Sequence, residues 1–188
     1  MSETTQFWLR LATLGLAAVI LQVAAVSQFT LFGINADITP LVVASAGLLT
    51  GAVAGSMLGF GMGLFVDLAL VQTLGVSALI YTLIGYGAGR LRELRAPQAT
   101  FTPLGLGAAA TAASTIGFSL MEFLLGVDAP VSFLLVRQTL ATIVLNTLIS
   151  LPVYALVRRW LRPVLPDDPR RRRRRAYTTG GLSPLSRG

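Results

Sequence analysis

The sequence predicts an all-α fold, a polytopic membrane protein with six transmembrane helices in a small bundle. Three observations lead to this prediction. The 188 residues are 54% hydrophobic, with a mean hydropathy of +0.72. Long stretches carry no charged residue, and glycines recur every fourth residue inside one of them. Such spacing allows lipid-embedded helices to approach closely, so the chain fits a single membrane domain.

The first span is expected within residues 11–36, which contain no charge and are long enough to cross a bilayer. The segment Ala25-Val26-Ser27 resembles the small-x-small cleavage site of a secretory signal, which is the alternative interpretation. We favour a retained span, because the residues before it hold only one arginine together with a glutamate, and the apolar stretch is long.

Residues 38–66 are uncharged, and a single helix of that length would measure roughly 43 Å against a bilayer core of ~30 Å. Two short helices joined by a tight turn near residues 50–55 are therefore the better interpretation. Further spans are expected at residues 71–89, 101–121 and 131–157. The total is six spans, or five if residues 38–66 form one helix.

Arginine placement predicts the orientation. Two clusters follow the fourth and sixth predicted spans: Arg90, Arg92, Arg95, Arg158, Arg159 and Arg162. Two spans separate the clusters, so both lie on one side, and the excess of positive charge in cytoplasmic loops makes that side the cytoplasm. We expect a multi-pass membrane protein with both termini in the cytoplasm.

We divide the chain into a membrane domain, residues 1–162, and a disordered polybasic cytoplasmic tail, residues 163–188. The tail contains a run of six arginines: Arg170, Arg171, Arg172, Arg173, Arg174 and Arg175. Such a run attracts anionic lipid at ~1 kcal/mol per residue near the surface, and an acidic cytosolic partner is the alternative. Nucleic acid is not expected as a partner, because Tyr177 is the only aromatic residue nearby.

Several classes of chemistry are excluded. The chain contains no cysteine and no histidine, so disulfides, thiolate catalysis and imidazole-based metal or catalytic sites cannot form. The carboxylates are scattered, and no phosphate-binding loop or other catalytic motif is present. We expect a protein that is not an enzyme and that needs no cofactor or metal.

Six glycines form the first candidate site, a helix-packing or partner interface: Gly51, Gly55, Gly59, Gly63, Gly85 and Gly89. Positions four apart in a helix share one broad face. The favoured interpretation is packing within the bundle. The alternative is that one face meets another subunit, either a partner protein or a second copy of this chain.

Three charged residues form the second candidate site, an outer charged zone or pocket. Asp67 and Glu122 end the third and fifth spans, and Arg137 lies roughly 10 Å inside the sixth. Charges at such depth are usually paired, so Arg137 could pair with Asp67 or Glu122 and close a pocket. The equal alternative is that Arg137 extends to the lipid headgroups while both acids are hydrated.

At these residues the chain resembles the MreD family of bacterial rod-shape determinants. The resemblance rests on Asp37-Ile-Thr-Pro40, on Gly59-Phe60-Gly-Met-Gly63-Leu64-Phe-Val-Asp67 and on the exit Gly85-Tyr86-x-x-Gly89-Arg90. Asn146 and Pro152 fit the family's last span, and Asn146 is expected to bond to a neighbouring helix. The polybasic tail is not part of the family pattern.

This resemblance implies a non-enzymatic scaffold of the cell-elongation machinery in the bacterial inner (plasma) membrane. Its implied partners are an MreC-like membrane protein, the MreB filament, a RodA-type glycosyltransferase and a class B penicillin-binding protein. The family also looks like a relative of the substrate-binding subunits of energy-coupling-factor vitamin transporters, which have six helices and an outward pocket. A vitamin-capturing transporter subunit is therefore the alternative function.

Overall fold

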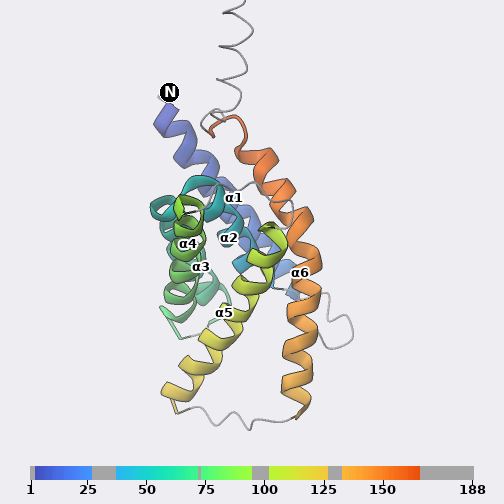
Figure 1. The fold of residues 1–188 in the computed structure, drawn as a ribbon. Coiled ribbons are helices and arrows are strands. Elements are labelled where there is room, and N and C mark those ends of the chain that lie inside the picture. Colours follow the sequence, from blue (N-terminus) through green and yellow to red (C-terminus); the bar gives the residue numbers. More distant parts are fainter. Residues whose placement is uncertain (1–2, 27–36, 72, 95–101, 127–132, 166–188) are drawn as a thin grey trace, which may run out of the picture.

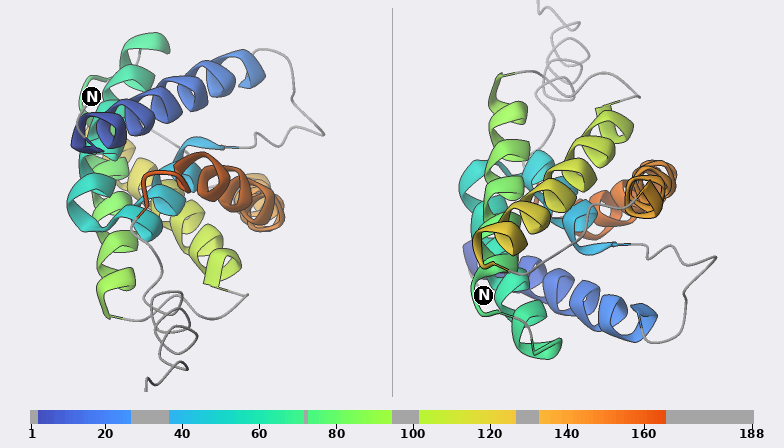
Figure 2. Two further views of the ribbon diagram at one scale, coloured as in Figure 1. Left: turned by 90° about the horizontal axis from the view of Figure 1, so that it is seen from above. Right: turned by 90° about the horizontal axis from the view of Figure 1, so that it is seen from below.

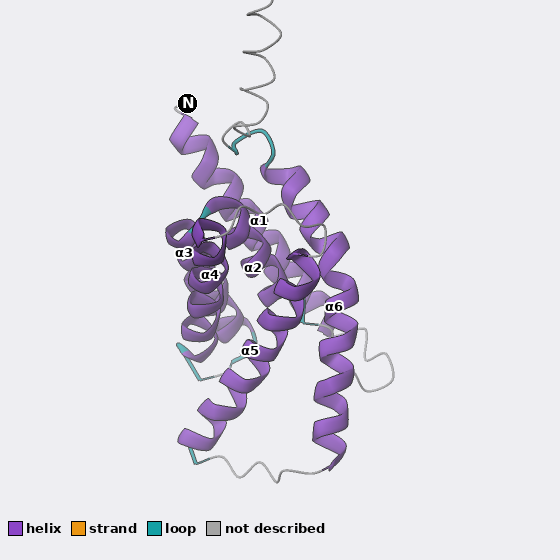
Figure 3. Cartoon of the chain, viewed as in Figure 1, coloured by secondary structure: helices purple, strands orange, loops and turns teal. Residues whose placement is uncertain are grey.

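The computed structural model describes residues 3–26, 37–71, 73–94, 102–126 and 133–165. These residues contain six helices and no strand (Figures 1 and 3). The helices are α1 (Glu3–Val26), α2 (Thr39–Thr50), α3 (Ala52–Ala69), α4 (Val76–Leu94), α5 (Thr102–Leu124) and α6 (Phe133–Leu161). The all-helical prediction is confirmed, while the arginine run and the rest of the predicted tail beyond residue 165 lie outside the described residues.

The turn predicted within residues 38–66 is present at Gly51, between α2 and α3. Gly51 has a φ of 103°, a conformation that residues with a side chain rarely adopt. Its N–H donates to the carbonyl of Gly47 at 2.8 Å and so closes α2. Pro40 stands in the first turn of α2, where a missing N–H costs nothing. Gly51 therefore forms the turn, and it also lies against α4, because a methyl group on Gly89 would overlap the Gly51 carbonyl carbon.

Helix α2 is the centre of the bundle. It contacts each of the other five helices, and every residue from Thr39 to Leu48 is buried. The views along the bundle show the same central position (Figure 2). With 12 residues, α2 is ~18 Å long, which covers only part of a ~30 Å bilayer core.

Four helices are long and apolar enough to cross a membrane: α1, α3, α5 and α6. Their outward surfaces carry large exposed apolar side chains such as Ile20, Phe65, Leu120 and Leu148. In water such surfaces would be unusual for a monomer, but lipid tails solvate them without cost. The structure is that of a helical membrane protein.

Helices α3 and α4 pack backbone to backbone. A methyl group on Gly59 would overlap the Tyr81 carbonyl of α4, and one on Gly63 would overlap the backbone of Ala78. The contact continues along both helices, with Gly85 against Gly55 and Gly89 against Ala52. The five glycines of the predicted face that lie in helices are thus brought together inside one chain.

Helix α2 joins this contact through Gly47. A methyl group there would lie 2.5 Å from the carbonyl oxygen of Gly85, and one on Gly55 would lie 2.6 Å from the same oxygen. Three helices therefore meet at one point without intervening side chains. By contrast, Gly61 and Gly87 have open space where a side chain would begin.

These contacts predict opposite effects for the same substitution at two glycines. Gly59→Ala should lower the thermal midpoint of the detergent-purified protein, with a cost of about 1–3 kcal/mol because the added methyl must push α4 away. Gly87→Ala, in the adjacent helix, should leave the midpoint unchanged or raise it, since alanine favours a helix by up to about 1 kcal/mol. Equal midpoints for the two variants would contradict the packing described here.

Candidate functional site

The bundle has two ends that differ in character. We call the end with the start of α1 and the end of α6 the terminal end, and the end with the α3–α4 turn and the end of α5 the hairpin end (Figure 1). A cavity of about 550 Å³ lies at the hairpin end. Its lining comes from α1, the start of α2, α3, α4 and α5: Gln22, Asp37, Val66, Leu70, Val71, Thr73, Val76, Ser77, Tyr81, Phe118, Met121, Glu122 and Leu125.

Asp37 is the polar centre of this cavity. Its Oδ2 accepts a hydrogen bond from the Tyr81 hydroxyl at 3.4 Å, and its Oδ1 accepts from the Thr39 N–H at 3.2 Å. The Asn146 side-chain amide donates to the Asp37 backbone carbonyl at 3.2 Å. Asp37 therefore links α2, α4 and α6, three helices that are far apart in the sequence.

The backbone just before α2 is held by a second polar group from another helix. The Gln22 Oε1 of α1 accepts from the Ile38 N–H at 2.8 Å. Because α2 is short, this non-helical segment lies within the bundle, where an unpaired N–H would be costly. Gln22 and the Asp37 carboxylate supply the acceptors that water would provide at an exposed helix start.

Asp67 is fully buried at the C-terminal end of α3. Its two carboxylate oxygens accept from the Gly75 N–H at 2.7 Å and the Ser77 N–H at 3.2 Å. Both donors lie at the start of α4, where free N–H groups and the helix dipole favour an anion. Asp67 therefore ties the α3–α4 turn to the start of α4, beside the cavity but not in its lining.

The predicted charged zone is only partly assembled. Glu122 is exposed and lines the cavity, while Asp67 is buried behind it. Arg137 is exposed on α6 and makes no ion pair with either acid. The expected pairing is therefore not formed, because backbone N–H groups satisfy Asp67. The ion pair found among the described residues is Arg90–Glu93 at 2.8 Å, at the terminal end.

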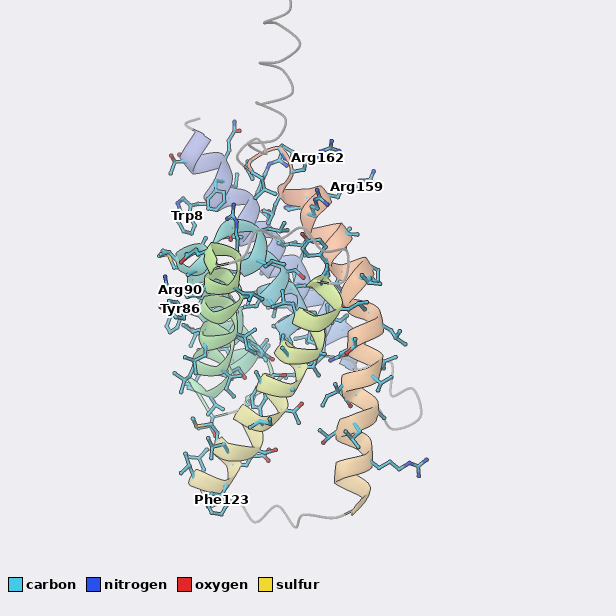
Figure 4. All side chains as sticks on the ribbon, viewed as in Figure 1. Trp8, Tyr86, Arg90, Phe123, Arg159 and Arg162 are labelled. Atoms are coloured by element: carbon cyan, nitrogen blue, oxygen red, sulfur yellow. The ribbon has the colours of Figure 1, made fainter. Side chains whose placement is uncertain are left out.

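Positive charge collects at the terminal end. Arg159 of α6 and Arg162 just after it lie toward that end, as do Arg90 of α4 and Trp8 of α1, whereas Phe123 lies at the other (Figure 4). Helices α1 and α6 are joined there by a reciprocal pair of bonds. The Arg10 guanidinium donates to the Trp160 carbonyl at 3.1 Å, and the Trp160 indole donates to the Arg10 carbonyl at 3.2 Å.

Asp37 and Tyr81 are site residues that spacing along the chain does not predict. Asp37 was visible as an Asp-x-Thr-Pro start of a helix, a pattern in which the carboxylate accepts from an N–H two residues on. Tyr81 gave no such signal, because its partner is 44 residues away. Asn146 bonds as expected, but to the segment that precedes α2 and not to a helix.

Residues 2–162 match the family model described as rod shape-determining protein MreD. The chain belongs to the MreD family. Neither the comparison with curated proteins nor the comparison with solved structures gives a match. The matched range includes all six helices, so the cavity, the glycine contacts and the Asp67 turn are parts of the family's domain.

Membership gives this MreD-family protein a rod-shape-determining role in the membrane. Its apolar helices make it a multi-pass membrane protein. The described residues contain no group of three or more histidine, cysteine, aspartate or glutamate side chains that could hold a metal ion. What the fold offers is a bundle with a positively charged end, an opposite end with an acidic cavity, and apolar sides.

The Asp67 contacts predict a structural requirement. Asp67→Asn should lower the free energy of unfolding by about 1–3 kcal/mol, because asparagine offers one acceptor oxygen to the two N–H groups of Gly75 and Ser77. The matched control Glu122→Gln changes an exposed acid and should cost less than about 0.5 kcal/mol. Detergent-melting midpoints compare the two.

A charge reversal at Arg137 completes this test. Arg137→Glu should change the free energy of unfolding by less than about 0.5 kcal/mol, because the guanidinium has no acidic partner among the residues that the structure describes. Rescue of a destabilised Asp67→Arg variant by Arg137→Glu would instead establish the pairing that the structure lacks.

Proposed function

We propose that this protein is a non-enzymatic scaffold of the bacterial cell-elongation machinery in the inner membrane. It would partner an MreC-like protein and connect the MreB filament to a RodA-type glycosyltransferase and a class B penicillin-binding protein. The observation that carries this proposal is the family match over residues 2–162. The apolar sides of the bundle suit contacts with other membrane-spanning proteins.

The proposal places the terminal end in the cytoplasm. Arginines of α1, α4 and α6 gather at that end, and the bias of basic residues toward cytoplasmic loops supports this orientation. Trp8 and Trp160 lie there too, and tryptophans favour the membrane–water interface. The arginine run at 170–175 would then hold the chain against anionic lipid of the inner leaflet.

We place the partner surface away from the glycine face, which was the alternative partner interface suggested by the sequence. The glycine face between α3 and α4 is filled within the chain, so it is not available to a second subunit. A groove of about 210 Å³ lies between α1 and α3 and is lined entirely by apolar residues and glycine, among them Trp8, Leu16, Gly61 and Phe65. We assign the membrane helix of the MreC-like partner to this groove, because the open position at Gly61 permits close approach.

The alternative function, a substrate-binding subunit of an energy-coupling-factor vitamin transporter, draws support from the cavity at the hairpin end. Those subunits commonly carry alanines four apart on the first helix. No alanine of α1 has another alanine four residues on. The scaffold therefore stays the preferred function.

Orientation can be tested directly because the chain contains no cysteine. Single-cysteine variants at Phe123, in the hairpin end, and at Arg162, in the terminal end, should differ when intact cells with a permeabilised outer layer receive an impermeant maleimide. Phe123→Cys should be labelled, and Arg162→Cys should be labelled only after the inner membrane is broken. Labelling of Arg162→Cys from outside would reverse the proposed topology.

Two glycine-to-leucine variants test the partner groove. Gly61→Leu should reduce co-purification of the MreC-like protein at least tenfold and produce rounded cells when it is the only copy, because the side chain enters the groove. Gly87→Leu also adds a side chain in open space, but on α4 away from the groove, and should keep both properties.

Melting midpoints near that of the parent establish that both variants fold. If Gly61→Leu retains the partner, the groove assignment fails. If depletion of the parent chain leaves rod shape intact and abolishes uptake of a vitamin, the scaffold proposal itself fails and the transporter alternative replaces it.

A further inference from the structure

The cavity at the hairpin end is acidic and has no cation of its own. Two carboxylates line it, Asp37 near its centre and Glu122 at its exposed rim. The lining contains no arginine, and the whole chain contains no lysine or histidine. The acids are therefore not neutralised from within the cavity.

The hydrogen bonds within the cavity do not compensate this charge. Asp37 accepts from the Tyr81 hydroxyl and the Thr39 N–H, which are both neutral donors. The neighbouring Asp67 accepts from two further neutral N–H groups. Neutral donors can satisfy a buried carboxylate, as they do at Asp67, but a partner of opposite charge would add to the stabilisation of Asp37.

A second observation shows that polar capacity in this cavity is left over. Ser77 is fully buried and belongs to the lining, and its hydroxyl has no hydrogen-bond partner. Such orphan groups are uncommon in folded proteins, where buried polar atoms are nearly always paired. As it stands the hydroxyl has no exposed surface, so a group in the cavity reaches it only when the Ser77 side chain rotates.

The remaining walls are apolar. Phe118 packs edge-on against Tyr81, with ring centroids 6.1 Å apart, and Val66, Leu70 and Met121 complete that side. A volume of about 550 Å³ lies in the range of small-molecule sites, about 300–1,000 Å³. Mixed apolar walls with a few polar groups are typical of such sites.

We propose that this cavity binds the ammonium or guanidinium end of a ligand with an apolar body, the cation between Asp37 and Glu122 and the apolar part against Phe118 and Met121. Tyr81 orients the Asp37 carboxylate, and the Ser77 hydroxyl accepts one N–H of the bound cation. The source of the cation is a free small amine or the ammonium headgroup of a membrane lipid. This inference stands independently of the scaffold proposal, because it concerns binding alone.

The experiment uses three probes that differ in charge. The purified full-length chain in nanodiscs of phosphatidylglycerol is titrated with tryptamine, its neutral alcohol analogue tryptophol and the anion indole-3-acetate, with saturation-transfer NMR as the readout. Tryptamine should bind at least tenfold more tightly than either analogue. Equal binding of tryptamine and tryptophol would overturn the proposal, because the site would then not distinguish a cationic ligand from a neutral one.

Matched variants locate the site. Glu122→Gln and Asp37→Asn should each weaken tryptamine binding at least fivefold, whereas Glu93→Gln, at the terminal end, should leave it unchanged. Glu122 is exposed, so its variant keeps the fold and decides the matter even if Asp37→Asn does not. Unchanged binding in Glu122→Gln would overturn the proposal.

Nanodiscs that also contain phosphatidylethanolamine distinguish the two sources. If this lipid weakens tryptamine binding while the phosphatidylglycerol fraction is held constant, its ammonium headgroup occupies the cavity. If it has no effect, the ligand is a free amine, and both results support a cation site. If depletion of the chain leaves rod shape intact while tryptamine still binds, the scaffold proposal fails and this site stands.

Discussion

Backbone contact between α3 and α4 is the interaction on which the other features depend. Side chains normally hold helix axes 8–10 Å apart, and the glycines at 55, 59, 63, 85 and 89 remove that separation. The close approach fixes the relative height of the two helices. Their turn is therefore placed so that the Asp67 carboxylate meets the Gly75 and Ser77 N–H groups. The wall of the cavity is built by the same contact.

The second constraint is the short central helix. Because α2 begins inside the bundle, its first N–H groups need acceptors from within the protein, and α1 and the chain just before α2 provide them through Gln22 and Asp37. Asn146 holds the Asp37 carbonyl from α6. Polar residues of the spans thus form hydrogen bonds with the segment at the start of α2. Gln22 and Asp37 of this network also line the cavity. The hydrogen bonds that give Asp37 its structural role therefore also hold its carboxylate in place for the proposed binding role.

Local features of this fold could be predicted from the sequence, but few of the contacts between residues far apart in the chain could. A 29-residue uncharged run exceeds one bilayer crossing, which was sufficient to predict the break that Gly51 makes. Glycines four apart predicted close packing, but not which helices would meet. The Asp37–Tyr81 bond spans 44 residues and the Asn146–Asp37 bond 109, so neither follows from spacing along the chain. Of the two equal alternatives for Arg137, the ion pair with Asp67 is not formed, because the donors to Asp67 are backbone N–H groups, which no residue pattern displays.

The placement of the glycines also determines what remains for recognition. The glycines spaced four apart on α3 and α4 face each other inside the chain. The surfaces left for a partner therefore have few small residues, as in the apolar groove beside Gly61. Such a groove selects by shape, because lipid tails are as apolar as any helix that replaces them. Charge distinguishes the two ends instead. Arg159 and Arg162 lie at the terminal end, whereas two carboxylates line the cavity at the other end, where Arg137 is exposed near the start of α6. Shape along the sides and charge at the ends are therefore separate means of recognition, and a substitution in one should leave the other intact.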